Sequence, residues 1–348
     1  MTAHASGLSA RDDLPTVVFS MAGAGIKLSA PAEVVEFVAW YTDGYFTRDR
    51  ASFDAHLVVH SSLPGRLDVT AVGPRTTLRG VDLPGITDAT CIADDSHAAL
   101  HLIVHADTET TGVHTVRLLR AMLLNRLLAE ANPFVHAACA AVDGAGVAFV
   151  GPRGCGKTTL LLHAAMAGVD IVGNDKISMA ATSSGVDALG FPVKIGVRAG
   201  SVLALDQGSL RAFLETQWDQ QTGGLERRAD DLATRIFARP QDLAAAASSG
   251  ISPQCRLAAI IEPRLQNGVG APRLERLSRE ETGALLNAGA LRGPTQVFPQ
   301  QAALSVEHRT QPAPWPDLPA YRLTYHAGSG RGSVDVIRDL LGSANLVR

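Results

Sequence analysis

The chain has 348 residues, of which 46% are hydrophobic, and a formal net charge of −3. This length and apolar content predict two domains, or one large domain with an appended module, and exclude a disordered chain. The small net charge and the lack of a basic block argue against a nucleic-acid-binding protein. Four cysteines, at positions 91, 139, 155 and 255, lack the C-x-x-C spacing of zinc sites and suggest no disulfide framework.

The beginning of the chain indicates where the protein works. Residues 1–15 are polar and lack the apolar core of a signal peptide, and no apolar run approaches membrane-spanning length. Together with the cysteine pattern, this predicts a cytoplasmic protein that binds neither a membrane nor nucleic acid.

Residues 1–110 predict an N-terminal α+β module. A helix is expected at 32–41, where apolar residues recur at helical spacing. His101 and His105 would share a strand face, but the further ligands that a metal needs are missing, so we prefer a structural role. The module is expected to help hold a substrate. Gly- and Pro-containing turns separate its predicted strands, which lie at 16–20, 55–60, 66–70 and 98–105.

Residues 111–348 predict a second domain of α/β class. Its first element is the strongest amphipathic helix pattern of the chain, at 113–131, which Asn132-Pro133 ends. A buried strand at 134–142 then turns at Asp143-Gly144 into a second strand at 146–150. Further elements are expected in the order strand 169–177, hairpin 178–200, helices 209–218 and 242–248, strand 256–263, strand 321–325 and helix 333–341.

The sequence at 151–158, Gly-Pro-Arg-Gly-Cys-Gly-Lys-Thr, matches the phosphate-loop (Walker A) pattern G-x-x-x-x-G-K-[ST] at every fixed position. An apolar strand precedes it and a helical run follows, which is the context that such a loop needs. The backbone N–H groups and the helix N-terminus would hold an anion, Lys157 would reach the β- and γ-phosphates, and Thr158 would ligate Mg²⁺. The predicted nucleotide-binding residues are Gly151, Pro152, Arg153, Gly154, Cys155, Gly156, Lys157, Thr158 and Thr159.

Two further residues narrow the class of nucleotide-binding protein. His136 precedes Gly151 on the neighbouring predicted strand, and Asp175 follows at the end of the next predicted strand. An Asp at that position can hold Mg²⁺ or accept a proton from an attacking hydroxyl. Alternatively, His136 is a hydrogen-bonded core histidine and Asp175 a plain strand-end carboxylate. Lys194 and Arg198 would face either the phosphates or solvent.

The order and spacing of His136, the loop and Asp175 resemble the core of bacterial HPr kinase/phosphorylase. The likeness is closer to HPr-kinase-like proteins of bacterial peptide natural-product clusters, such as those for lasso peptides. It covers roughly residues 132–200 and implies a P-loop kinase core of the HPr kinase / phosphoenolpyruvate carboxykinase type. It also implies catalytic roles for His136, Lys157 and Asp175, with Asp175 as the proton acceptor, and metal binding by Thr158 and Asp175.

This sequence departs from the family's pattern in three places. Asn174-Asp175 stands where the family usually has two aspartates, and the chain lacks a counterpart to the acidic metal ligand downstream and to the family's own N-terminal domain. These departures argue against HPr as the substrate and against the reverse phosphorylase reaction.

The combined reading is an ATP- and Mg²⁺-dependent kinase that phosphorylates a Ser or Thr hydroxyl on a peptide or small protein. One alternative is a catalytically silent nucleotide-binding partner of a peptide-modifying complex, which Asn174 favours. Another is a small-metabolite kinase, because the sequence does not locate the acceptor pocket. The sequence leaves open whether the chain forms a homo-oligomer.

Overall fold

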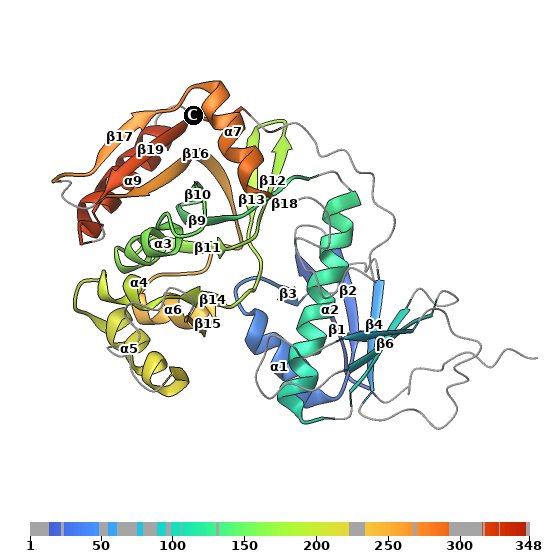
Figure 1. Cartoon of the computed structure of the whole chain (residues 1–348). Helices are drawn as coiled ribbons and strands as arrows, with labels where there is room; N and C mark the ends of the chain where they lie inside the picture. Colours follow the sequence, from blue (N-terminus) through green and yellow to red (C-terminus); the bar gives the residue numbers. More distant parts are fainter. Residues whose placement is uncertain are drawn as a thin grey trace, which may run out of the picture. The chain divides into compact units, whose positions relative to one another are not determined.

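The computed structural model describes residues 14–21, 24–48, 55–60, 75–78, 89–94, 99–104, 106–129, 132–222, 234–266, 270–291, 315, 317–326 and 328–345. The described residues form two compact units, one up to residue 129 and one from residue 132 onward (Figure 1). This division places the long helix at 108–129 in the first unit, whereas the sequence predicts a domain boundary at residue 110 and so places most of this helix in the second domain.

Unit 1 is a mixed sheet with two helices that pack together, and the longer helix also packs against the sheet. Its strand order is β3-β1-β2-β4-β7-β6-β5, with the β2–β4 and β4–β7 pairs parallel and the other pairs antiparallel. The elements are β1 (Thr16–Met21), β2 (Ala24–Ser29), α1 (Ala32–Thr42), β3 (Thr47–Arg48), β4 (Ala55–His60), β5 (Arg75–Leu78), β6 (Ala89–Asp94), β7 (Ala99–Ile103) and α2 (Thr108–Ala129).

The amphipathic prediction for the helix α2 is wrong. The helix begins at Thr108, earlier than expected, because the side chain of Asp107 accepts a hydrogen bond from the Thr110 N–H (2.7 Å) and so caps the first turn. Its described side chains are buried on almost every side, and His114 and Thr115 are fully buried. A helix covered all round belongs to a core rather than to a surface stripe.

Unit 2 is built on a larger sheet around the strand β10. Within the described residues its order is β11-β9-β10-β16-β13-β12-β8-β18, with β19 paired to both β16 and β17. The elements are β8 (Phe134–Val135), β9 (Ala137–Val142), β10 (Ala145–Val150), α3 (Lys157–Met166), β11 (Asp170–Asn174), β12 (Ile177–Thr182), β13 (Gly185–Leu189), β14 (Ile195–Val197), α4 (Ala199–Leu203), α5 (Ser209–Thr222), β15 (Ile236–Ala238), α6 (Pro240–Ala247), β16 (Gln254–Leu265), β17 (Arg273–Arg276), α7 (Arg279–Gly289), β18 (Ala290–Leu291), β19 (Ala320–Tyr325) and α9 (Gly330–Asn345).

Two apolar clusters cover the two faces of this sheet. One cluster joins α3, α4, α5, α6 and α9 to one face, and the other joins α7 to the opposite face. Strands β10, β16 and β19 are parallel neighbours, so their carboxyl ends meet at one edge. In open α/β sheets that edge is where ligands bind. The loop after β10 lies there.

Several predicted elements of unit 2 are confirmed. Asp143 and Gly144 both have positive φ, 49° and 79°, as the tight hairpin between β9 and β10 requires. The strand predicted at 256–263 is β16, and the closing helix predicted at 333–341 is α9. Two strands were predicted as continuous but are interrupted, at His136 and at Asp175. The strand predicted at 66–70 and His105 lie outside the described residues.

Candidate functional site

The loop at 151–156 joins the fully buried strand β10 to the helix α3. Gly154 and Gly156 have φ of 88° and 104°, in the region that disfavours side chains. A Cβ on Gly156 would lie 2.4 Å from the hydroxyl oxygen of Tyr325, which is fully buried beneath the loop. The Tyr325 O–H donates to the Gly156 carbonyl (3.1 Å). The loop path therefore demands glycine for two reasons, conformation and space.

Lys157, the first residue of α3, turns back across the loop. Its ammonium donates to the carbonyls of Gly151 (2.7 Å) and Pro152 (3.0 Å). An ammonium group carries three donors, so these two bonds leave one for an anion over the loop. The first N–H groups of a helix also lack partners within the helix. The loop therefore gathers a cation and the positive end of a helix at one place.

The next two residues hold the helix start to its neighbours through their hydroxyls. The Thr158 hydroxyl donates to Oδ1 of Asn174, the last residue of β11 (3.2 Å). The Thr159 hydroxyl is bonded to the Ser201 hydroxyl of α4 (2.8 Å). Thr158 and Asn174 thus present two oxygen atoms side by side, next to the strand end where Asp175 follows. Nucleotide binding by Thr159, as by the other predicted residues of the loop, stays a prediction.

His136 and Asp175 meet where two strand segments are interrupted. His136 lies between β8 and β9, and Asp175 lies between β11 and β12; β8 pairs with β12, and β9 pairs with β11. The two breaks therefore stand opposite each other. His136 Nδ1 is 3.3 Å from Asp175 Oδ1, and Lys176 Nζ is 3.6 Å from the other carboxylate oxygen.

The backbone at Asp175 is strained. Its φ of 76° lies in the left-handed region, where a residue with a side chain costs roughly 1–2 kcal/mol. Strain of this kind is concentrated at functional sites, where the surrounding structure holds it in place. The carboxylate is nearly half exposed. Asp175 is therefore an accessible acid on a strained turn, fixed by a histidine and a lysine.

Burial changes the proton affinity of three groups at the site. It lowers the pKa of His136, against an opposing effect of the Asp175 charge, so the imidazole is neutral at pH 7. It also lowers the pKa of Lys157, while Cys155 and Asp175 act in the opposite direction. Burial raises the pKa of the Cys155 thiol, which makes that cysteine less reactive.

Two arginines stand near the same loop. Arg153 is an exposed loop residue, and its charge contributes to lowering the pKa of His136. Arg198 precedes α4, and its guanidinium Nη1 lies 3.9 Å from the position that a Cβ on Gly154 would take. Of the two placements open to Arg198, facing the phosphates or facing solvent, the structure favours the loop side.

The donor set is suited to a hard cation. The Thr158 hydroxyl, the Asn174 amide oxygen and the Asp175 carboxylate are all oxygen donors, the kind that Mg²⁺ prefers. They carry one formal negative charge between them. Among the described residues, no group of three or more His, Cys, Asp or Glu side chains is placed to hold a metal. A cation here would thus depend on phosphate oxygens for much of its coordination.

Sequence reasoning named most of these residues but missed how they are supported. The bond from Thr158 to Asn174 and the packing of Tyr325 beneath Gly156 join residues far apart in the chain. No local pattern points to either contact. A helix long and apolar enough to cross a membrane is absent from the part of the chain that the structure describes.

Comparisons with known proteins give little beyond this geometry. No protein-family model matches the chain, and no curated protein matches it. Among solved structures, the chain is similar to the Hpr(Ser) kinase/phosphatase from Coxiella burnetii. That similarity has a TM-score of 0.29 and 11% sequence identity, and it covers 61% of this chain and 96% of that one. The function of this chain is therefore inferred from its own site.

Proposed function

We propose that the chain is an ATP- and Mg²⁺-dependent kinase that phosphorylates a Ser or Thr hydroxyl of a peptide or small protein. The observation that supports it most is the His136–Asp175 pair at the strand breaks beside a phosphate-binding loop. A loop that only bound nucleotide would need no accessible, strained carboxylate next to it. Phosphoryl transfer needs a positioned base together with charge stabilisation.

In the proposed phosphoryl transfer, each residue of the site has its own role. The hydroxyl oxygen of the acceptor attacks the γ-phosphorus, a new O–P bond forms, and the bond between the γ-phosphorus and the bridging oxygen breaks to release ADP. Asp175 takes the hydroxyl proton, and His136, neutral at pH 7, orients that carboxylate. Lys157 and the loop N–H groups stabilise charge on the phosphate oxygens, with Arg198 as an additional cation.

Mg²⁺, when bound, would neutralise charge on the β- and γ-phosphates. Thr158 and Asp175 are its proposed ligands. Asn174 Oδ1, bonded to the Thr158 hydroxyl, would contact the ion directly or through water. A protein site with so few charged ligands fits a cation that arrives with the nucleotide.

Asn174 also favours a second candidate, a nucleotide-binding regulatory partner that transfers no phosphate. An amide at this position contributes no negative charge beside Thr158, and metal-dependent transfer depends on that charge. In this alternative, nucleotide binding would act as a switch, and Asp175 would serve only as the partner of His136 and Lys176.

The kinase is tested by incubating it with ATP, Mg²⁺ and candidate Ser- and Thr-containing peptides, including those encoded beside its gene, and measuring peptide mass. A mass gain of one phosphate is expected with the wild-type protein. Asp175→Asn should reduce the transfer rate by about 10²- to 10⁴-fold, because the proton acceptor is lost. Nucleotide binding, measured by calorimetry, should persist in that variant.

Lys157→Ala is the matched comparison, because it removes the loop cation and should weaken both nucleotide binding and transfer. Undiminished transfer by Asp175→Asn would disprove the base assignment. Clear nucleotide binding without transfer to any peptide would favour the regulatory alternative.

A further inference from the structure

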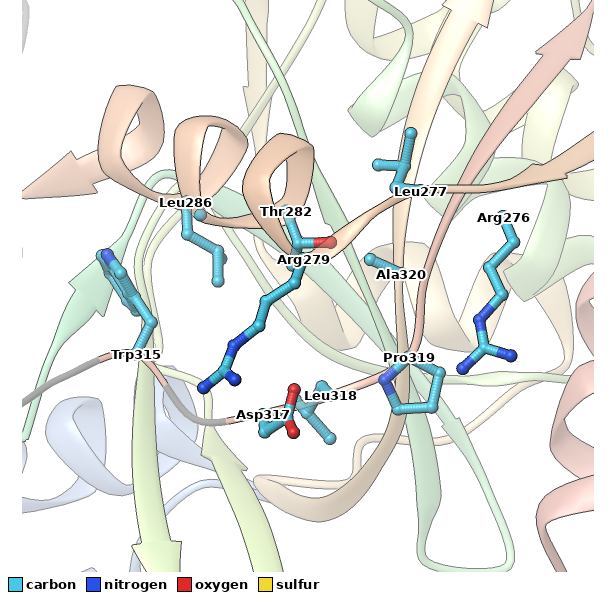
Figure 2. Close-up of a pocket in the computed structure, with 11 residues that line it drawn as sticks. Arg276, Leu277, Arg279, Thr282, Leu286, Trp315, Asp317, Leu318, Pro319 and Ala320 are labelled. Atoms are coloured by element: carbon cyan, nitrogen blue, oxygen red, sulfur yellow. The ribbon is translucent and has the colours of Figure 1, made fainter.

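A cavity of about 370 Å³ lies on the α7 face of the sheet in unit 2. Its walls come from the end of β17, the first two turns of α7 and the segment that leads into β19. Figure 2 shows Arg279, Trp315 and Asp317 around this space, with Leu286 and Leu318 beside them. The volume is within the range of ligand-binding pockets.

The lining mixes polar and apolar side chains and has an excess of positive charge. Arg276 and Arg279 both line the cavity, and Asp317 is the acidic residue that lines it with them. Within the described part of the chain, neither guanidinium group has a hydrogen-bond or ion-pair partner. Guanidinium groups without partners, next to leucine side chains and an indole, suit a ligand that joins a carboxylate to an apolar group.

The helix α7 connects this cavity to the candidate site. Its first two turns line the cavity, and its last residue, Gly289, accepts a hydrogen bond from the His136 N–H (2.8 Å). From Gly283, in the lining, to Gly289 the helix rises about 9 Å, at ~1.5 Å per residue. Near the C-terminal end, Trp315 Nε1 donates to the Asn287 side chain (3.0 Å).

An extended peptide can span this interval. At ~3.3 Å per residue, roughly three to five residues cover the distance from the cavity to the neighbourhood of His136. An acceptor hydroxyl at Asp175 would then leave the neighbouring part of the same peptide at the cavity.

We propose that this cavity is the docking site for the acceptor peptide, and that it selects an acidic side chain next to an aliphatic one. Arg276 and Arg279 supply the positive charge that attracts the carboxylate, and the leucine side chains and Trp315 take the aliphatic side chain. The phosphorylated hydroxyl lies roughly three to five residues away along the peptide. This inference rests on the proposed kinase function and names the substrate feature that such a kinase would read.

The test uses the full-length protein and a library of peptides that share one fixed serine, with acidic, basic, aliphatic and neutral residues varied around it. Two quantities are measured separately: peptide retention on the immobilised protein, and phosphate incorporation with ATP and Mg²⁺. The wild-type protein should retain peptides with an acidic–aliphatic pair three to five residues from the serine. The double variant Arg276→Glu/Arg279→Glu should retain them about tenfold less and should favour basic peptides.

Arg273→Glu is the charge-matched control, because this exposed arginine lies on β17 but outside the cavity lining. It should leave peptide selection unchanged. An unchanged selection in the double variant, or no enrichment by the wild-type protein, would overturn the proposal. So would loss of a dimer in the double variant without altered selection, because the cavity would then bind a second copy of the chain. The retention assay needs no phosphate transfer, so failure of the kinase function would be seen separately, as selective retention without incorporation.

Discussion

The loop at 151–156 and the α7 cavity differ in the groups that form them, which are backbone groups in the loop and side chains in the cavity. The loop uses backbone groups held by glycines, and a methyl group added at Gly156 would meet Tyr325. The cavity is made of side chains, and a methyl group added at Gly283, in its wall, would meet nothing within 4 Å. At Gly156 the loop has no room for an added atom, whereas at Gly283 the cavity wall has.

This difference indicates what each region can recognise. A loop fixed by glycines at the N-terminus of a helix suits a phosphate, which every donor nucleotide carries. A cavity lined by long arginine side chains can adapt to peptides that differ in detail. The nucleotide, which is the same in every reaction, would bind to the backbone of the loop. The acceptor peptide, which can vary, would bind to the side chains of the cavity. The following predictions test that contrast, beginning with the largest expected effect.

Gly156→Ala should destabilise the protein by roughly 2–4 kcal/mol. The residue would keep a φ of 104°, and its Cβ would press on the buried hydroxyl of Tyr325. Thermal or denaturant unfolding gives the change in free energy. Gly154→Ala is the control, since it has a similar φ of 88° and no atom closer than 3.9 Å, so it should show the conformational cost alone. Equal losses in the two variants would contradict the packing argument.

Asn174→Asp should tighten Mg²⁺-dependent nucleotide binding about tenfold, or ~1.4 kcal/mol. The new carboxylate would lie beside the Thr158 hydroxyl and add a negative charge to the oxygen donors. Calorimetry of nucleotide binding at several Mg²⁺ concentrations measures the effect. Asn174→Ala removes the oxygen and should weaken the same binding. If neither variant changes the dependence on Mg²⁺, the ion does not bind at this position.

Gly283→Ala should stabilise the protein, by about 0.5–1 kcal/mol, although the residue lines the cavity. It lies within the helix α7, where alanine is favoured over glycine, and the added Cβ has free space. Unfolding measurements beside Gly156→Ala would give the contrast directly. Destabilisation would show that the cavity wall is packed more tightly than its geometry indicates.

The smallest expected effect is on the pH dependence of stability. Burial lowers the pKa of His136 in the folded protein below its ordinary value of 6.5, which applies in the unfolded chain. At pH values between the folded and the unfolded pKa, the unfolded chain therefore binds more protons than the folded protein. The free energy of unfolding should therefore fall as the pH drops through this window. In His136→Asn that contribution should be absent. Subtracting the free energy of unfolding of His136→Asn from that of the wild-type protein, at each pH from 7 to 5, gives the contribution of His136. A difference of opposite sign would contradict the lowered pKa.

The sequence was sufficient to predict the loop region because backbone constraints there restrict residue type. Only glycine fits at Gly156, and a tight hairpin favours Asp143-Gly144. The residue types at these positions therefore predict the loop and the hairpin directly. The roles expected of His136 and Asp175 came from spacing and a family resemblance, and they stay predictions. Their geometry did not, since the sequence gives no sign that two predicted strands are interrupted, at His136 and at Asp175-Lys176.

The cavity could not have been predicted in the same way. Its residues come from 276–286 and 315–320, and no residue type is required at any of these positions. Arginine and tryptophan on a surface are compatible with many environments. The burial of α2 was missed for a similar reason, since its threonines, histidine and arginines suggested a polar face that the structure covers. Tertiary contacts, rather than local pattern, decide such features.

The way in which α7 is attached has a consequence for how this protein can change over evolutionary time. The helix begins with its own capping box, in which Ser278 and Glu281 satisfy each other's backbone groups, and it packs on the sheet through side chains. Its N-terminal half can therefore accumulate substitutions without disturbing the β10 loop. If the proposed docking role is right, a gene duplicate could acquire a new peptide preference in few mutations while the proposed nucleotide site is inherited intact.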